Sequence, residues 1–445
     1  MGQVIQGDCL AVLPTLEAES VDLVCTDPPY GISFMGQSWD KALPNPAIWR
    51  ECLRVLKPGG FAFIMALPRM YHRLAVAVED AGFIVHTPLA WAFASGFPKA
   101  QDVGKTIDRM AGMEREVIGV KADPRWLSPR SNSPHRMNWL KGQEGGHGKD
   151  HPAAQVLAPA TPLARDRDGW KVGNSCLKPA WEAVGWFQKP PSERTLVANV
   201  LKHGVGAINA RAGAIPSQQP ISTHHFEGNH AFDQGRGVQD YHEHEGRFPA
   251  NLIVEDDVLD DGKEHPSATN EPHAPPSMFL RDGPRKWWSS GDSGSFSRYF
   301  SLDAWMDKFV ANLPPSVQRT FPFLIVPKAG KKERDSGLRQ AEGNRAPVFG
   351  RENYPDGSKR PHFWQRNDHN TVKPLKLMLW LITLATRPGY TVLDPFMGTG
   401  TTLMACKALG REGIGVEIDP HWCDVARARI AAVQEAALPL PEEKP

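Results

Sequence analysis

Residues 21–30 read VDLVCTDPPY, and this stretch decides the fold of the chain. Its apolar first part predicts a short, buried strand of a parallel sheet. Two prolines then end the strand, because proline cannot donate a ladder hydrogen bond, and Pro28 restricts Asp27 to extended geometry. Open α/β sheets bind ligands at the carboxyl ends of their strands, so residues 27–30, here called the elbow, are expected to line a cleft.

The elbow presents groups that suit a flat molecule with an exocyclic amine. The carboxylate of Asp27 and the carbonyl of Pro28 can each accept one amine hydrogen, while Pro29 keeps the backbone stiff and Tyr30 stacks on the ring. The alternative interpretation is a strand-ending turn with a solvated Asp27. A second motif near the other end of the chain favours the chemical interpretation.

That second motif reads DPFMGTGTT at residues 394–402. It follows a predicted strand at 390–393 and precedes a predicted helix at 403–409 and a strand at 413–417. Gly398 and Gly400 allow the backbone to approach a ligand, and Glu417, 19 residues after Gly398, is placed to bind a ribose diol. No third glycine follows in place, which disfavours a nicotinamide cofactor and leaves room for another adenosine-bearing ligand without a pyrophosphate.

Strands and helices alternate over residues 1–95, which predicts a doubly wound α/β fold. Predicted strands include 4–6, 61–65 and 89–93, and predicted helices include 9–13, 46–56 and 70–81, with residues 57–60 ending the second helix. Residues 181–187 predict a returning strand that pairs near Trp91, and residues 192–203 predict a helix capped near Ser192 or Glu193. Further elements are predicted at 102–110, 251–254, 302–313, 321–326 and 375–386.

The predicted domain plan is a core interrupted by long insertions. Residues 1–100 form one half of the core, 101–176 a loop-rich insertion and 177–190 a returning core strand. Residues 191–368 form a candidate target-recognition region, 369–435 the cofactor-binding half of the core and 436–445 a tail.

Composition sets wider bounds. The chain has 445 residues, 41% of them hydrophobic, and a formal net charge of +1, so any surface for nucleic acid must be local. We expect no signal peptide and no membrane span. The cysteines contain no C-x-x-C pair, which predicts reduced core residues of a cytoplasmic protein and no structural zinc site. They are Cys9, Cys25, Cys52, Cys176, Cys406 and Cys423.

Three further features fall in the middle region. Five histidines cluster between His224 and His244, and we interpret them as a solvated loop rather than a metal site. Trp287 and Trp288 beside Arg285 are either core residues or a base-stacking platform. Basic residues outnumber acidic ones at 331–366, which suits either phosphate contacts or a solvated loop.

Together the two motifs resemble the β group of S-adenosylmethionine-dependent DNA amino-methyltransferases, in which the catalytic motif comes first and the cofactor glycines come last. Residues 7–10, 56–60 and 415–420 are similar to further segments of that family, and residues 369–374 resemble its His-x-x-x-Lys-Pro element. The resemblance implies a circularly permuted Rossmann-like sheet, mostly parallel with an antiparallel hairpin. Residues 391–417 are then expected beside residues 4–27.

The resemblance also implies the site and its ligands. Catalysis is assigned to the elbow, residues Asp27, Pro28, Pro29 and Tyr30. S-adenosylmethionine is assigned to Asp8, Lys373, Asp394, Phe396, Gly398, Gly400, Thr401 and Glu417. The implied substrate is double-stranded DNA, from which a base must be flipped out, with Phe34 or Trp39 as further stacking candidates. A homodimer and a cognate restriction endonuclease are candidate partners.

The target base stays open at this point. Asp rather than Ser at the elbow favours N6 of adenine, and the alternative is N4 of cytosine. Protein-glutamine methyltransferases begin a similar elbow with Asn and place the glycine turn first, which disfavours them. A catalytically silent DNA-binding module and a nicotinamide-dependent oxidoreductase are the more distant alternatives.

Overall fold

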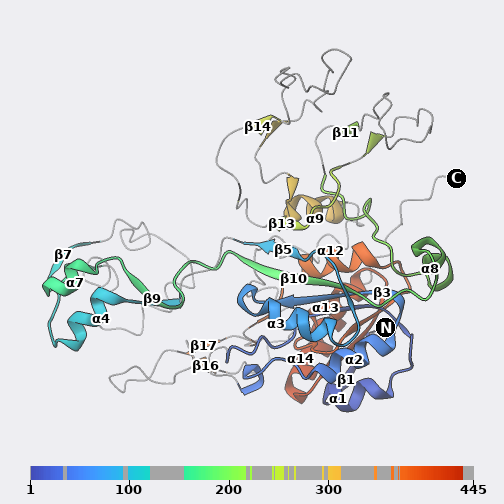
Figure 1. Ribbon diagram of the computed structural model, residues 1–445, viewed down its shortest axis with the longest axis horizontal. Helices are drawn as coiled ribbons and strands as arrows, with labels where there is room; N and C mark the ends of the chain where they lie inside the picture. Colours follow the sequence, from blue (N-terminus) through green and yellow to red (C-terminus); the bar gives the residue numbers. More distant parts are fainter. Residues whose placement is uncertain are drawn as a thin grey trace. The chain divides into compact units, whose positions relative to one another are not determined.

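The computed structural model forms two compact units, seen in Figure 1. The core unit comprises Met1–Ala94, Trp181–Asn344 and Gln365–Pro445, and the smaller unit comprises Ser95–Ala180 and Arg345–Trp364. The residues that the structure describes are 2–33, 38–93, 99–120, 155–216, 221–222, 243–244, 246–254, 259, 265–266, 293–294, 299–311, 345–347, 362–364, 369 and 371–433.

A mixed, mostly parallel sheet organises the core unit. In the described residues it has nine strands, with eight in the order β1-β19-β18-β2-β3-β10-β5-β13 and β4 paired to β10. In that order the strands are β1 Gln3–Gln6, β19 Glu412–Glu417, β18 Thr391–Asp394, β2 Val21–Thr26, β3 Leu56–Ala66, β10 Trp181–Gln188, β5 Leu89–Ala92 and β13 Leu252–Val254, and β4 is Ile84–Val85.

The two ends of the chain meet inside this sheet. β19 pairs in parallel with both β1 and β18, and β18 pairs in parallel with β2, where Leu393 stands opposite Val24. The predicted permutation is therefore confirmed. The returning strand is confirmed as well, because β10 runs antiparallel to β3 and β5, with Glu182 opposite Trp91.

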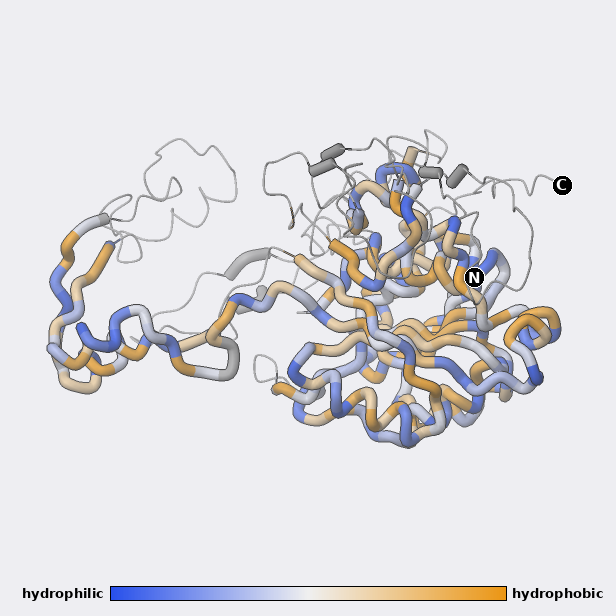
Figure 2. Tube along the Cα trace, turned by 45° about the horizontal axis from the view of Figure 1, so that its top comes forward, coloured by the Kyte–Doolittle hydropathy of each residue, from blue (hydrophilic) through white to orange (hydrophobic). Residues whose placement is uncertain are grey.

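Helices cover both faces of the sheet because its central strands are apolar on both sides. Leu23 and Cys25 of β2 face one cluster of buried residues, whereas Val24 faces the other. Figure 2 shows the apolar, orange segments gathered in the sheet region of this unit. The first cluster contains buried residues of four helices, α9 Leu302–Ala311, α12 Leu375–Ala385, α13 Thr401–Ala408 and α14 Pro420–Ala431. The second contains buried residues of α1 Cys9–Val12, the 3-10 helix η1 Leu13–Thr15, α2 Pro46–Val55 and α3 Pro68–Glu79.

The predicted end of the helix before residues 57–60 is confirmed to within one residue, because α2 ends at Val55, but the following strand begins earlier than predicted: β3 starts at Leu56 rather than at residue 61. Gly59 has φ +81° at an irregular part of β3, where its amide donates to the carbonyl of Lys189 on the chain beyond β10. A side chain on Gly59 would meet Asn199 of helix α8 (Leu196–His203) at 2.2 Å, so this glycine serves a close tertiary approach.

The cap of α8 is also corrected. The helix spans Leu196–His203 and begins after Thr195, whose side chain accepts from the amide of Ala198. Ser192, one of the two predicted caps, instead donates its amide to the side chain of Asn199. Glu193, the other, lies with it ahead of the helix.

The smaller unit holds more regular structure than its predicted loop character suggested. In addition to the predicted helix, α4 Val103–Met110, the structure shows β7, β8, α7 and β9, which are each too short, at three to five residues, to display a period. Asp108 of α4 is buried and accepts from the amides of Ala160 and Thr161 and from Arg115. The elements are β6 Lys99–Asp102, β7 Val117–Val120, β8 Gln155–Leu157, α7 Pro162–Asp166, β9 Lys171–Ser175, β16 Arg345–Pro347 and β17 His362–Trp364.

The region predicted for target recognition contributes to the core unit. Its β13 extends the main sheet beyond β5, and its α9 packs against α12. Two small ribbons in the region pair β11 Ile221–Ser222 with β12 Glu243–His244 and β14 His265–Pro266 with β15 Ser293–Gly294. Several predicted features lie outside the described residues. They are the strand at 321–326, Trp287 and Trp288, most of the histidine cluster and nearly all of the basic segment at 331–366.

Several predictions from composition can be compared with the structure. The cysteines are free thiols and five are buried, but Cys176 is exposed, which corrects its assignment to the core. It lies just after β9, outside both buried clusters. No helix in the described ranges combines the length and apolar character that crossing a bilayer requires. Among the described residues, no group of His, Cys, Asp or Glu could hold a metal ion.

Candidate active site

Backbone hydrogen bonds to one carboxylate hold the elbow in place. β2 ends at Thr26, and the side chain of Asp40, in the 3-10 helix η3 Ser38–Asp40, accepts from the amides of Tyr30 at 2.7 Å and Gly31 at 2.9 Å. Asp40 is buried, and Gly31 has φ +68°, a conformation that favours glycine. The chain after the prolines is therefore turned so that Asp27 and Tyr30 project together.

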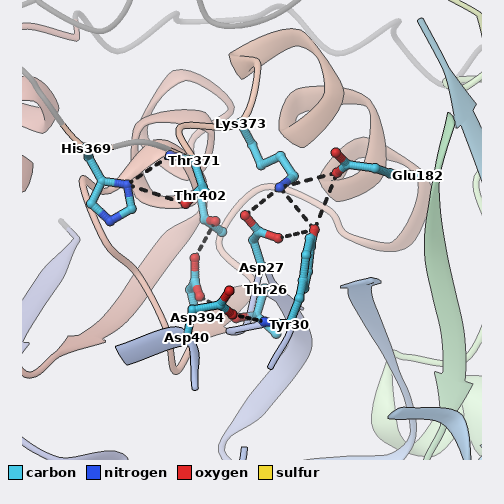
Figure 3. A network of polar contacts seen from close by, with 10 residues as sticks. All are labelled: Thr26, Asp27, Tyr30, Asp40, Glu182, His369, Thr371, Lys373, Asp394 and Thr402. Atoms are coloured by element: carbon cyan, nitrogen blue, oxygen red, sulfur yellow. Dashed lines mark hydrogen bonds and ion pairs between the residues drawn. The ribbon is translucent and has the colours of Figure 1, made fainter. Parts of the chain in front are cut away.

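Asp27 belongs to a network of four side chains, whose other members are Tyr30, Lys373 and Glu182 (Figure 3). One oxygen accepts from the Tyr30 hydroxyl at 2.7 Å, and the other accepts from the Lys373 ammonium at 2.6 Å. Lys373 also lies 3.1 Å from the Tyr30 hydroxyl. Glu182, on β10, completes the network, since its Oε2 is 3.4 Å from both the Lys373 ammonium and the Tyr30 hydroxyl.

Burial and mutual charge set the protonation of this network. Burial raises the pKa of Asp27, Lys373 works against this rise, and Glu182 adds to it. Burial by itself lowers the pKa of Lys373, but Asp27 and Glu182 outweigh that effect and raise it. Burial, then Asp27, raises the pKa of Tyr30 well above its usual value. Lys373 therefore stays charged between two acids, and Tyr30 stays a neutral donor.

The turn at residues 395–400, here called the glycine turn, joins β18 to α13. Gly400 has φ +78°, and a side chain on it would meet Ala426 of α14 at 2.9 Å, so only glycine fits. Arg429, fully buried on α14, fixes the turn by donating to the carbonyl oxygen of Thr399 at 2.6 Å and to its hydroxyl at 2.7 Å. Gly398 also has a positive φ, of +52°.

Glu417 is oriented by backbone amides at the end of β19. Its Oε2 accepts from the Gly398 amide at 3.0 Å, and its Oε1 accepts from the Asp419 amide at 2.9 Å. Burial raises its pKa, although these amides work against that rise. The carboxylate is thus held at the glycine turn, and its remaining lone pairs can accept from a hydroxyl pair.

Asp394, the acid that opens the second motif, serves as an internal anchor. It is buried and accepts from the Thr26 hydroxyl at 2.6 Å, the Thr402 hydroxyl at 2.5 Å and the Phe396 amide at 3.1 Å. Burial raises its pKa to about 6, even though these three hydrogen bonds work in the opposite direction. Asp394 therefore ties the glycine turn to the strand that carries the elbow.

Asp27 of the elbow and the glycine turn line one pocket, whose empty space of about 380 Å³ includes open solvent. The structure thus brings Asp27 next to Lys373 and the second motif, both of which lie more than 300 residues after Asp27 in the sequence. The pocket is lined by Asp27, His369, Thr371, Val372, Lys373, Met378, Asp394, Phe396, Met397, Gly398, Thr399, Thr401 and Thr402.

Asp8 lies at the edge of this arrangement. It caps α1 by accepting from the Leu10 amide at 2.9 Å, and it is exposed rather than part of the pocket lining. Its neighbours connect to the site: the Gly7 amide donates to the Glu417 carbonyl, and the Cys9 thiol donates to the Pro395 carbonyl at 2.7 Å. The predicted role of Asp8 toward a cofactor remains a prediction.

Sequence reasoning missed two contributors to the site, Glu182 and Asp40. Glu182 was predicted only as part of a strand, although a lone acid in the apolar run 181–187 was the available signal. Asp40 gave no signal, because its partners are backbone amides. Trp39, predicted as a stacking candidate for a base, is half exposed and stacks on His369 at 5.9 Å, and His369 meets the edge of Trp422 at 4.8 Å. Phe34 lies outside the described residues.

Two curated relatives match a short part of the chain. The type II methyltransferase M.HinfI of Haemophilus influenzae is 44% identical over 66 residues, which are 15% of this chain and 18% of the relative. The type II methyltransferase M2.DpnII of Streptococcus pneumoniae is 40% identical over 67 residues, 15% of this chain and 25% of the relative. The match therefore spans a quarter or less of either relative.

Solved structures align over most of the chain at low identity. A DNA modification methylase of Thermus thermophilus in complex with S-adenosyl-L-methionine is 15% identical, with 97% of this chain and 95% of that chain covered and a TM-score of 0.35. The cytosine-N4-specific PvuII DNA methyltransferase is 12% identical, with 96% and 86% covered and a TM-score of 0.37.

The family comparison is much broader. A family model described as DNA methylase, of the N6/N4 methyltransferase type, matches residues 21–428, a range that includes both the elbow and the glycine turn. This match covers far more than half of the chain, so the protein belongs to the N6/N4 DNA methylase family.

Proposed function

We propose that this protein methylates the exocyclic amine of a base flipped out of double-stranded DNA, with N6 of adenine as the target. One observation carries the proposal: the Asp27 carboxylate and the glycine turn line the same pocket. An amine acceptor and a cradle for an adenosine-bearing ligand are the two parts that such a transfer needs.

S-adenosylmethionine is the methyl donor of this family. The residues of this chain fit it. Gly398 and Gly400 adopt positive φ angles, and a side chain at Gly400 would collide with α14, so the turn keeps the open backbone that a close ligand requires. Glu417 is oriented by two amides to bind a ribose diol. When bound, the donor supplies an electrophilic methyl group on a sulfonium.

The remaining steps rest on the chain's own residues. An amino group conjugated to a base ring is a poor nucleophile, because its lone pair is delocalised into the ring. Hydrogen bonds from the amine to the Asp27 carboxylate and the Pro28 carbonyl favour tetrahedral nitrogen, which frees the lone pair. Flipping the base costs a few kcal/mol, and stacking on Tyr30 offsets part of that cost.

Adenine is preferred over cytosine because the elbow begins with Asp rather than Ser, the feature by which the resemblance favours adenine. N4 of cytosine is the second candidate, since the geometry around Asp27 suits either amine. The same proposal includes double-stranded DNA as the substrate and a cytoplasmic location. It also includes a homodimer and a cognate restriction endonuclease as partners. Recognition of the target sequence is assigned to residues 191–368.

The test is nucleoside analysis of DNA incubated with the purified protein and S-adenosylmethionine carrying a labelled methyl group. We expect the label in N6-methyladenine. Label in N4-methylcytosine would replace the first candidate by the second. Absence of label, together with no cofactor binding in calorimetry, would favour a silent DNA-binding module. Base-modification sequencing of host DNA with and without the protein would then give the recognition sequence.

A further inference from the structure

The Asp27 carboxylate already holds two donors, where an incoming amine must also bind. Tyr30 occupies one oxygen at 2.7 Å and the Lys373 ammonium occupies the other at 2.6 Å. The ammonium competes with a neutral amine for the same acceptor. It also opposes the reaction, because the amine nitrogen gains positive charge as the methyl group is transferred, and like charges repel.

Glu182 offers both donors a second acceptor. Its Oε2 lies 3.4 Å from the Lys373 ammonium and 3.4 Å from the Tyr30 hydroxyl, on the side of the network away from Asp27. Figure 3 shows the Lys373 ammonium between the two carboxylates, with the Tyr30 hydroxyl reaching both. The three charged side chains are largely shielded from solvent, with 10–18% exposure, so their charges interact more strongly than at the surface.

We propose that Glu182 is a positioning residue that takes the Lys373 ammonium, and with it the Tyr30 hydroxyl, away from Asp27 when the target amine arrives. Asp27 then accepts from the amine while the ammonium is paired with Glu182. No covalent bond or proton moves in this exchange. Hydrogen bonds are redistributed, and Lys373 remains charged throughout. This inference rests on the proposed function, because it assumes an amine at Asp27.

The test variant is Glu182→Gln, which keeps an acceptor oxygen for Tyr30 but removes the charge that attracts Lys373. We expect a 10- to 100-fold fall in the single-turnover rate of methyl transfer, with the Kd values for DNA and S-adenosylmethionine changed less than threefold. Glu193→Gln is the matched control, because Glu193 forms a surface ion pair with Lys202 outside the site. It is expected to behave like the wild type.

A double-mutant cycle separates this role from a merely structural one. Lys373→Met removes the competing cation, so adding Glu182→Gln to it should cost less than threefold. The proposal would be overturned if Glu182→Gln lowered the methyl-transfer rate by the same factor in the wild-type and Lys373→Met backgrounds. It would also be overturned if the Glu182→Gln single variant were as active as the wild type.

An equilibrium measurement provides a readout without turnover. With S-adenosylhomocysteine present, we compare binding of DNA carrying the target base with DNA in which that base lacks its amino group. The wild type should prefer the amine, and Glu182→Gln should lose most of this preference. An unchanged preference would overturn the exchange while leaving the proposed function intact. A wild-type protein that methylates neither base would instead remove the proposed function, and the inference with it.

Discussion

Two Asp-Pro pairs stand at the carboxyl ends of neighbouring parallel strands, and their carboxylates are used in opposite ways. Asp27, just after β2, accepts from a lysine and a tyrosine at the pocket, whereas Asp394, the last residue of β18, accepts from two threonines and a backbone amide in the interior. Thr26, which precedes Asp27, is one of the donors to Asp394. The same dipeptide thus gives a reactive acceptor or a structural anchor, depending on its neighbours.

The largest effect is expected at the first acid. Asp27→Ala should lower methyl transfer by about 10³-fold or more, because the acceptor that orients and polarises the amine is lost. Cofactor affinity should stay within about twofold of wild type, since the glycine turn is untouched. Methyl-transfer assays and calorimetry on the same preparation measure both quantities. Activity within tenfold of wild type would contradict the assignment.

The second acid should respond in stability instead. Asp394→Asn replaces one acceptor oxygen by an amide group that cannot accept, so a buried threonine hydroxyl loses its partner. We expect a loss of about 1–3 kcal/mol in the free energy of unfolding, with weaker cofactor binding as the glycine turn loosens. Urea unfolding compares this variant with Asp27→Asn, which should lose less. Equal losses in the two variants would remove the distinction between anchor and acceptor.

A smaller effect is expected at the support of the elbow. Asp40→Ala removes the acceptor of the Tyr30 and Gly31 amides, so Asp27 and Tyr30 lose their fixed direction. The rate of methyl transfer should fall about tenfold, because the corresponding change in activation free energy is comparable to the net free energy of one hydrogen bond. Asp40→Asn keeps an acceptor oxygen and should retain most of the activity. If Asp40→Ala and Asp40→Asn lowered methyl transfer equally, loss of the hydrogen bonds to the elbow would not explain the lower activity.

The smallest effect concerns pH. Burial raises the folded-state pKa of Asp394 to about 6 from 3.8, so the folded protein binds this proton more tightly than the unfolded chain does. Its ionisation therefore costs stability progressively as pH rises from about 4 to 6, and the cost is constant above that range. Relative to Asp394→Asn, the wild type should lose about 1 kcal/mol between pH 5 and pH 7. Urea unfolding at both pH values measures this, and a difference independent of pH would contradict it.

Local signals were enough to predict the sheet and both motifs. An apolar run stopped by prolines predicted β2, and glycines between a strand and a helix predicted the turn at Gly398 and Gly400. Lys-Pro-Gly-Gly at residues 57–60 ended the predicted helix to within one residue, but the strand that follows was predicted only from residue 61. The pairing of Gly59 and Gly60 with Lys189 placed them in β3 instead. Tertiary pairing overrode the local preference there.

The charge relations of the site were beyond local reasoning. The prediction assigned Lys373 to the cofactor, whereas the structure also places its ammonium on Asp27, 346 residues away. Glu182 reaches the same network from β10, for which the apolar sequence pattern predicted a strand but no role in the site. Such contacts depend on the sheet order, which brings together side chains from the elbow after β2, from β10 and from Lys373 just ahead of α12. No single window of sequence contains that order.

The pairing of β2 with β18 also has a consequence during synthesis. Ribosomes add about 5–20 residues per second, so about 20–70 seconds separate the appearance of Asp27 from that of Lys373, 346 residues later. Throughout this interval the nascent chain lacks β18, one of the two sheet neighbours of β2, and the open edge of β2 invites wrong pairing. A chaperone that shields this edge on the ribosome would therefore raise the yield of folded protein.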